Sequence, residues 1–157
     1  MILDSLILQT KLFLSGDMDI EIQKVEIEND NPNKLKLKDF TSMIGTGGSL
    51  NAMIVVSLDT SMLEQLVELF MDGEEVEEDE KEEVYDSVSG EVINTIIGLA
   101  LPTFPNRGKN VTITPPITIN DASNVKKYKD TNIISAVIIT EFGEMSISAL
   151  GQDDLIK

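Results

Sequence analysis

Two polar side chains three positions apart, Glu91 and Asn94, are the residues of this sequence best placed to do chemistry. On a helix, residues at this spacing lie on adjacent turns, close enough to address one target. A carboxylate accepts hydrogen bonds and pairs with cations, whereas a carboxamide both donates and accepts hydrogen bonds. The pair therefore offers a negative charge and a neutral hydrogen-bonding group to the same target.

The residue types that are missing narrow the chemistry further. The chain has no cysteine and no histidine, which excludes thiolate nucleophiles, zinc-thiolate sites, imidazole-ligated metals and Ser-His catalysis. Any reaction must use carboxylates, amides, hydroxyls or lysines. A carboxylate-based hydrolase needs two inward-facing acids in a cleft, and we find no such pair, because Glu64 and Glu68 are interpreted as solvent-exposed helix residues.

The pattern Glu-x-x-Asn is weak evidence by itself. It also occurs twice in a predicted strand end and turn, at Glu26/Asn29 and Glu28/Asn31. The third copy differs because it lies on a long predicted helix, approximately residues 79–101, which Pro102 and Pro105 end. This context favours a functional role for Glu91 and Asn94.

At 100° per residue, the long helix has a predicted core face and a separate polar stripe. The core face comprises Tyr85, Val88, Val92, Ile96 and Leu99. The stripe comprises Ser87, Glu91, Asn94 and Gly98. We expect the helix to pack on a sheet with the first face and to present the second to solvent. Ile97 lies between them and is expected to rim a docking site or a dimer contact.

Two glycines, Gly90 and Gly98, lie within the same helix. Each costs about 1 kcal/mol relative to alanine, so a close approach of another backbone is expected there. The approaching backbone belongs either to a neighbouring element of the chain or to an incoming partner protein, and the sequence leaves both interpretations open.

An acidic run precedes the helix. Residues Glu74–Glu83 are all acidic apart from Val76 and Lys81. One interpretation is a solvated linker with negative charge near the helix N-terminus, where the helix dipole favours it. The other is a patch that steers a basic partner toward the helix. The two interpretations are compatible.

The whole chain is also acidic, with 28 acidic and 12 basic residues and a formal net charge of −16. Such a surface repels phosphate backbones and anionic membranes, so neither nucleic acid nor a membrane is an expected partner. The apolar stretch near the N-terminus, residues 2–14, is too short and too charged to span a bilayer and carries no leader signal. A cytoplasmic location is expected.

The remaining periodicity predicts one domain, residues 1–157, with helices packed on a largely antiparallel sheet. Helices are expected at 2–14 and from Thr60 or Ser61 to Met71, the second with a capping box formed by Ser61 and Glu64. The glycines of Met43–Gly48 are expected in a hairpin. The predicted strands are 20–28, 35–40, 51–58, 111–119 with a break at Pro115-Pro116, 132–142 and 145–150. The fold class is α+β.

These features resemble the CheX, CheC and FliY group of response-regulator phosphatases, and CheX most closely. The resemblance rests on Met71-Asp72-Gly73-Glu74, on the acidic run, and on Glu91 to Ala100 with Asn94 and Gly98. The strand pattern fits on both sides. The resemblance implies an α/β sandwich with two long helices packed on one face of the sheet, and it implies a homodimer.

For function, the resemblance implies a phosphatase acting on the aspartyl phosphate of a CheY-like response regulator. Asn94 would enter the regulator's active site and orient the attacking water, since an acyl phosphate already has a good leaving group. Glu91 would pair with the regulator's lysine. The partner-binding surface would comprise Ser87, Gly90, Ile97 and Gly98. The Mg²⁺ would be supplied by the regulator, and no metal or cofactor of the chain's own is expected.

The sequence departs from the family pattern in several places. CheC-like relatives carry two copies of the motif, and one usable copy stands here. The family's downstream proline lies one position later than Pro116, and Leu101 stands where a basic residue is frequent. Two alternatives stay open: a non-catalytic response-regulator-binding or flagellar-switch-like module on the same fold, and an assembly protein whose acidic face keeps it in solution.

Overall fold

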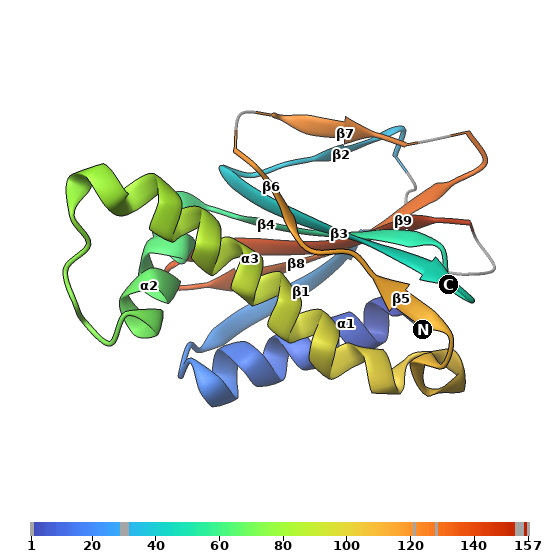
Figure 1. Cartoon of the computed structure of the whole chain (residues 1–157), viewed down its shortest axis with the longest axis horizontal. Helices are drawn as coiled ribbons and strands as arrows, with labels where there is room; N and C mark the ends of the chain where they lie inside the picture. Colours follow the sequence, from blue (N-terminus) through green and yellow to red (C-terminus); the bar gives the residue numbers. More distant parts are fainter. Residues whose placement is uncertain (1, 29–31, 121, 128, 153–155, 157) are drawn as a thin grey trace.

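The computed structural model describes residues 2–28, 32–120, 122–127, 129–152 and 156. A seven-stranded antiparallel sheet forms its centre, with the helices on one face and a two-stranded ribbon on the other (Figure 1). The expectation of an α+β fold with helices on a largely antiparallel sheet is confirmed. None of the described helices is both long and apolar enough to cross a membrane.

Among the described residues, three α-helices cover the sheet. α1 spans Ile2–Leu12 and continues as a π-helical turn, Phe13–Asp17. α2 spans Thr60–Phe70, and α3 spans Lys81–Ala100. Short 3₁₀ turns flank α3 at Glu78–Glu80, Leu101–Thr103 and Pro105–Gly108. α3 is the longest of the three and lies across the others and the sheet (Figure 1).

The strands of the main sheet follow the order β1-β8-β9-β4-β3-β5, and β6 also pairs with β3. Their bounds are β1 Ile22–Glu28, β3 Phe40–Gly48, β4 Ala52–Leu58, β5 Val111–Ile113, β6 Ile117–Ile119, β8 Asn132–Thr140 and β9 Gly143–Gly151. The ribbon pairs β2, Lys34–Lys36, with β7, Asn124–Lys126. The predicted break at Pro115-Pro116 separates β5 from β6, because proline cannot donate to a strand ladder.

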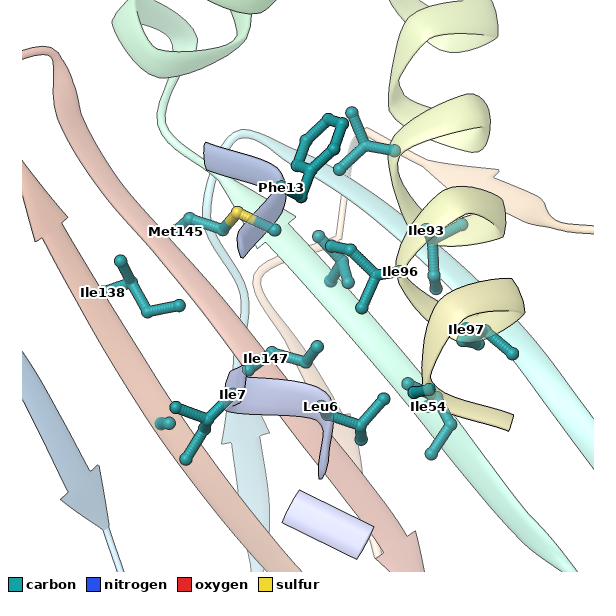
Figure 2. Packing of buried hydrophobic residues seen from close by; sticks show 14 of the residues in the cluster. Leu6, Ile7, Phe13, Ile54, Ile93, Ile96, Ile97, Ile138, Met145 and Ile147 are labelled. Carbon is teal, nitrogen blue, oxygen red and sulfur yellow. The ribbon is translucent and has the colours of Figure 1, made fainter. Parts of the chain in front are cut away.

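The alternation of side chains along β4 explains how both faces of the sheet are covered. Ile54, Val56 and Leu58 point into the main core beneath the helices, whereas Val55 points into a smaller core under the ribbon. Figure 2 shows the main core, with Ile54 facing the isoleucines of α3 and α1 packing beside them. Burial on both faces makes β4 a nearly continuous apolar run.

The expected hairpin forms between β3 and β4. Met43–Gly48 belongs to its first strand, and the turn begins only after Gly48, whose φ of 82° suits glycine. Another local prediction is wrong. The Ser61–Glu64 capping box does not form, because Asp59 is the N-cap residue and no side-chain cap is made there. Instead, the Asp39 carboxylate accepts hydrogen bonds from the Thr60 amide and hydroxyl at 3.0 and 2.8 Å. The predicted turn at 28–33 includes residues outside the described part of the chain.

Candidate functional site

The polar stripe predicted on the long helix lies on the outer side of α3. Ser87, Glu91 and Gly98 are exposed, and Asn94 is half-buried. The opposite side is buried and comprises Val88, Ser89, Gly90, Val92, Ile93, Ile96, Ile97 and Ala100. Because this 20-residue helix is packed along its buried side, it holds the side chains on its outer side in a fixed orientation.

The carboxylate of Glu91 and the carboxamide of Asn94 are available for hydrogen bonds with a partner molecule. Within the part of the chain that the structure describes, neither side chain has a hydrogen bond or an ion pair. The three-residue spacing places them on adjacent turns of the same side. Partial burial of Asn94 restricts its rotamers, so the amide is held more firmly than a fully exposed one would be.

Three contacts set the position of α3 above the sheet. The Ser89 and Ser42 hydroxyls share a buried hydrogen bond of 2.6 Å between α3 and β3. Asp86 accepts a hydrogen bond from the Asn120 side chain, just after β6. A Cβ added at Gly90 would lie 3.4 Å from Cγ of Pro116. These contacts fix the rotation of the helix, and hence the direction in which Glu91 and Asn94 point.

The two glycines of α3 turn out to have different surroundings. Gly90 is buried and packs against Pro116 of the same chain, so its expected role as a partner-binding residue is wrong and the packing interpretation holds. Gly98 is exposed, and a Cβ built there meets nothing within 4 Å. The helix surface at Gly98 is therefore open to a close approach from outside.

Ile97 was expected to rim a docking site or a dimer contact, and this is wrong because its side chain is 0% exposed. Leu99, assigned to the core face, is instead 44% exposed. The buried face is rotated from the predicted one and has the polar residue Ser89 near its middle. The pattern was ambiguous because apolar residues occur all around the second half of the helix.

Sequence reasoning also missed two exposed apolar side chains on the short strands β5 and β6. Ile113 of β5 is 43% exposed and Ile117 of β6 is 61% exposed. Ile117 directly follows Pro116, which contacts Gly90, so it lies beside the helix. A strand with an outward isoleucine next to a polar helical stripe provides apolar contact area for a partner. The only signal in the sequence was the Pro-Pro pair that marked an edge strand.

The acidic run ends in the first turn of α3, where Glu82 and Glu83 are exposed. Lys81 forms a 3.0 Å ion pair with Glu78, and this hydrogen bond raises the pKa of the lysine above its usual value. The entrance to α3 is therefore strongly negative. The approach to Glu91 and Asn94 favours a cationic surface.

The fold is similar to that of several solved structures. A CheX from Desulfovibrio desulfuricans matches with a TM-score of 0.77 at 18% identity, covering 94% of this chain and 97% of the other. A putative chemotaxis protein from Desulfovibrio vulgaris Hildenborough also gives 0.77, at 24% identity, covering 94% of both chains. The Borrelia burgdorferi CheX, solved as a CheX-CheY-BeF₃-Mg²⁺ complex, gives 0.68 at 20% identity, covering 96% and 97%. These likenesses define the fold as that of the CheX and CheC-like proteins.

The particular family follows from the sequence itself. The family model described as chemotaxis phosphatase CheX matches residues 40–140, which include all of α3. This chain belongs to the CheX family. No curated protein sequence matches it.

Proposed function

We propose that this chain hydrolyses the aspartyl phosphate of a CheY-like response regulator. The proposal rests on Glu91 and Asn94 of α3. Glu91 is exposed and Asn94 is half-buried, and neither side chain has a hydrogen bond or an ion pair within the described part of the chain. Membership of the chemotaxis phosphatase family supports the reaction class. The Borrelia burgdorferi relative, solved with CheY, supports the class of partner.

In this proposal Asn94 is the catalytic group. An acyl phosphate carries a good leaving group, so hydrolysis depends chiefly on placing a water molecule in line with phosphorus. A carboxamide is not a base at neutral pH, but its oxygen and nitrogen can hold that water by hydrogen bonds. The contribution of Asn94 is therefore the orientation of the water, which is a geometric effect.

Glu91 docks the regulator by pairing with a lysine near the phosphorylated aspartate. Ser87 and Gly98 lie on the same exposed side of α3 and extend the contact along the helix. Ile117 adds apolar area at one border. The Mg²⁺ in this reaction belongs to the regulator, where it neutralises charge on the phosphoryl oxygens. We also propose that the working form is a homodimer.

The direct test is the decay of a phosphorylated CheY-like regulator with and without this protein. We expect the protein to accelerate loss of the phosphoryl group at catalytic, substoichiometric concentrations. Binding of the phosphorylated regulator without any acceleration would contradict the proposal. That result would identify the chain as a non-catalytic binding module on the same fold.

A further inference from the structure

A long stretch of this acidic chain contains no acidic residue. From Val92 to Asn120 there is no aspartate or glutamate, and the two charged residues are Arg107 and Lys109. Arg107 is also the only arginine of the chain. The stretch covers the second half of α3, the turn that follows it, and the strands β5 and β6. The charge along α3 therefore changes from strongly negative at its N-terminal end to positive at the turn beyond its C-terminal end.

The turn after α3 holds Arg107 in an unfavourable backbone conformation. Asn106, Arg107 and Gly108 have φ angles of 56°, 56° and 68°, all in the left-handed region. Asparagine and glycine adopt this region readily, whereas it is costly for a residue with a long side chain such as arginine. Residues held in such conformations are concentrated at functional sites. The conformation of Arg107 therefore indicates a role other than local stability.

Contacts with α3 and with the turn between β3 and β4 fix this segment. A Cβ added at Gly108 would lie 2.6 Å from the carbonyl oxygen of Leu101, so the segment folds tightly back on the end of α3. The Ser49 hydroxyl donates to the Lys109 carbonyl at 3.0 Å, and the Ser49 amide donates to the Asn110 carbonyl at 2.9 Å. The Arg107 side chain is exposed, and within the described part of the chain it has no hydrogen bond or ion pair.

The turn lies at the C-terminal end of the stripe that carries Glu91 and Asn94 (Figure 1). Leu101, on which the turn packs, is seven residues beyond Asn94, or about 10 Å along the helix axis. Gly98 lies between them and leaves the helix surface open. An interface of standard size buries about 800 Å² on each partner, which corresponds to a radius of about 16 Å. A partner centred on Asn94 therefore also covers the turn.

We propose that Arg107 is a docking residue that pairs with a carboxylate on the surface of the response regulator. A guanidinium group forms two parallel hydrogen bonds with a carboxylate, a geometry that lysine does not reproduce. Glu91 pairs with a lysine near the centre of the contact, and Arg107 pairs with an acid at its border. Because the two pairs have opposite sign, together they define one orientation of the regulator on α3. The identity of the partner rests on the proposed function, and Arg107 adds the charge pattern that this partner must carry.

Substitution of Arg107 separates docking from catalysis. Binding is measured with a CheY-like regulator carrying BeF₃⁻ and Mg²⁺, and turnover is measured by decay of the phosphorylated regulator. We expect Arg107→Gln to raise the dissociation constant and KM about three- to tenfold, while kcat at saturating regulator stays unchanged. Arg107→Lys keeps the charge but loses the planar group, so its affinity should be intermediate. Lys11→Gln removes one positive charge from an exposed position on α1 and should change neither binding nor turnover.

The backbone conformation of Arg107 gives a second readout. Arg107→Asn removes the same charge as Arg107→Gln but introduces a residue that tolerates the left-handed region. We expect Arg107→Asn to melt about 2–4 °C above Arg107→Gln and to bind the regulator equally weakly. Higher stability together with lower affinity is the behaviour of a residue that is retained for binding.

Several results would overturn the docking role. One is wild-type affinity in Arg107→Gln, and another is an equal loss of affinity in Lys11→Gln, which would assign the effect to net charge. A lower kcat with an unchanged KM would place Arg107 in the chemical step instead. A lower melting temperature for Arg107→Asn than for Arg107→Gln would mean that the longer side chain stabilises the fold by packing.

The two assays also distinguish this inference from the proposed function. A wild-type protein that binds the regulator without accelerating the decay would contradict the phosphatase function, and the affinities of the Arg107 variants would still decide the docking role. A wild-type protein that does not bind the regulator would contradict both. Accelerated decay by the wild type with an unchanged KM in Arg107→Gln would contradict the docking role alone.

Discussion

At the scale of single residues, Glu91 and Asn94 have different proposed contributions. Glu91 is exposed and charged, so its effect on a partner should be electrostatic and sensitive to salt. We predict that Glu91→Gln weakens regulator binding several-fold at low ionic strength and much less at high ionic strength. The salt dependence of the dissociation constant is the measurement.

The matched control for Glu91 is Glu68→Gln, which removes the same charge from an exposed position on α2. It should leave regulator binding close to the wild-type value at every salt concentration. Equal effects of the two substitutions would mean that Glu91 acts only through net charge and not through a specific pair.

Gly98 provides a second prediction at this scale. Because a Cβ there meets nothing within 4 Å, Gly98→Ala should stabilise the folded chain by up to about 1 kcal/mol. If the regulator approaches the helix closely at this point, the same methyl group should weaken regulator binding. Urea unfolding and a binding isotherm measure the two effects. Gly16→Ala, also in open space, should not change binding, and unchanged binding by Gly98→Ala would remove Gly98 from the contact.

At the scale of elements, the position of α3 depends on its buried hydrogen bond to β3. Among the described residues no buried side-chain nitrogen or oxygen lacks a partner, and Ser89→Ala would create one at Ser42. We predict a loss of about 1–3 kcal/mol in the free energy of unfolding. Removing both hydroxyls with Ser42→Ala/Ser89→Ala should cost less than the sum of the single changes. Additive effects in this double-mutant cycle, measured in urea, would show that the bond does not hold the helix.

The same elements show how far the sequence could predict the structure. The short apolar run of β4 and the proline break between β5 and β6 were sufficient to place those strands, because each reflects a local constraint. The rotation of α3 was not predictable in the same way. Ile96, Ile97 and Leu99 are apolar on several sides of the helix, and only the contacts with β3 and β6 decide which are buried. The cap of α2 was missed because Asp39 reaches it from a distant part of the chain.

The candidate site was predictable only in part for a related reason. The outward direction of Glu91 follows from helical periodicity, since it lies opposite the buried side of α3. The burial of Gly90 follows instead from its contact with Pro116, 26 positions later in the chain, which no local pattern encodes. The predicted roles of Glu91 and Asn94 remain predictions.

At the scale of the whole molecule, charge is distributed unevenly and should affect association rates. Glu82 and Glu83 are exposed in the first turn of α3, close to the candidate site in sequence and on the same helix. We predict that Glu82→Gln/Glu83→Gln slows association with the regulator several-fold at low ionic strength, with little effect on the dissociation rate. Stopped-flow kinetics over a salt series measures this.

The control for steering removes the same charge elsewhere. Glu21→Gln/Glu28→Gln neutralises two exposed acids at the ends of β1, outside the helical layer. If both double variants slow association equally, total charge and not its location on α3 governs the encounter.

The catalytic role of Asn94 is tested by comparing Asn94→Ala with the wild type in a phospho-regulator decay assay, with regulator binding measured in parallel. We expect binding and fold to be retained while the dephosphorylation rate falls by roughly tenfold to a thousandfold, because a group that positions the water is lost. Gln65→Ala, which removes a half-buried carboxamide from α2, should leave the rate unchanged. A wild-type dephosphorylation rate in the Asn94→Ala variant would contradict a catalytic role for Asn94.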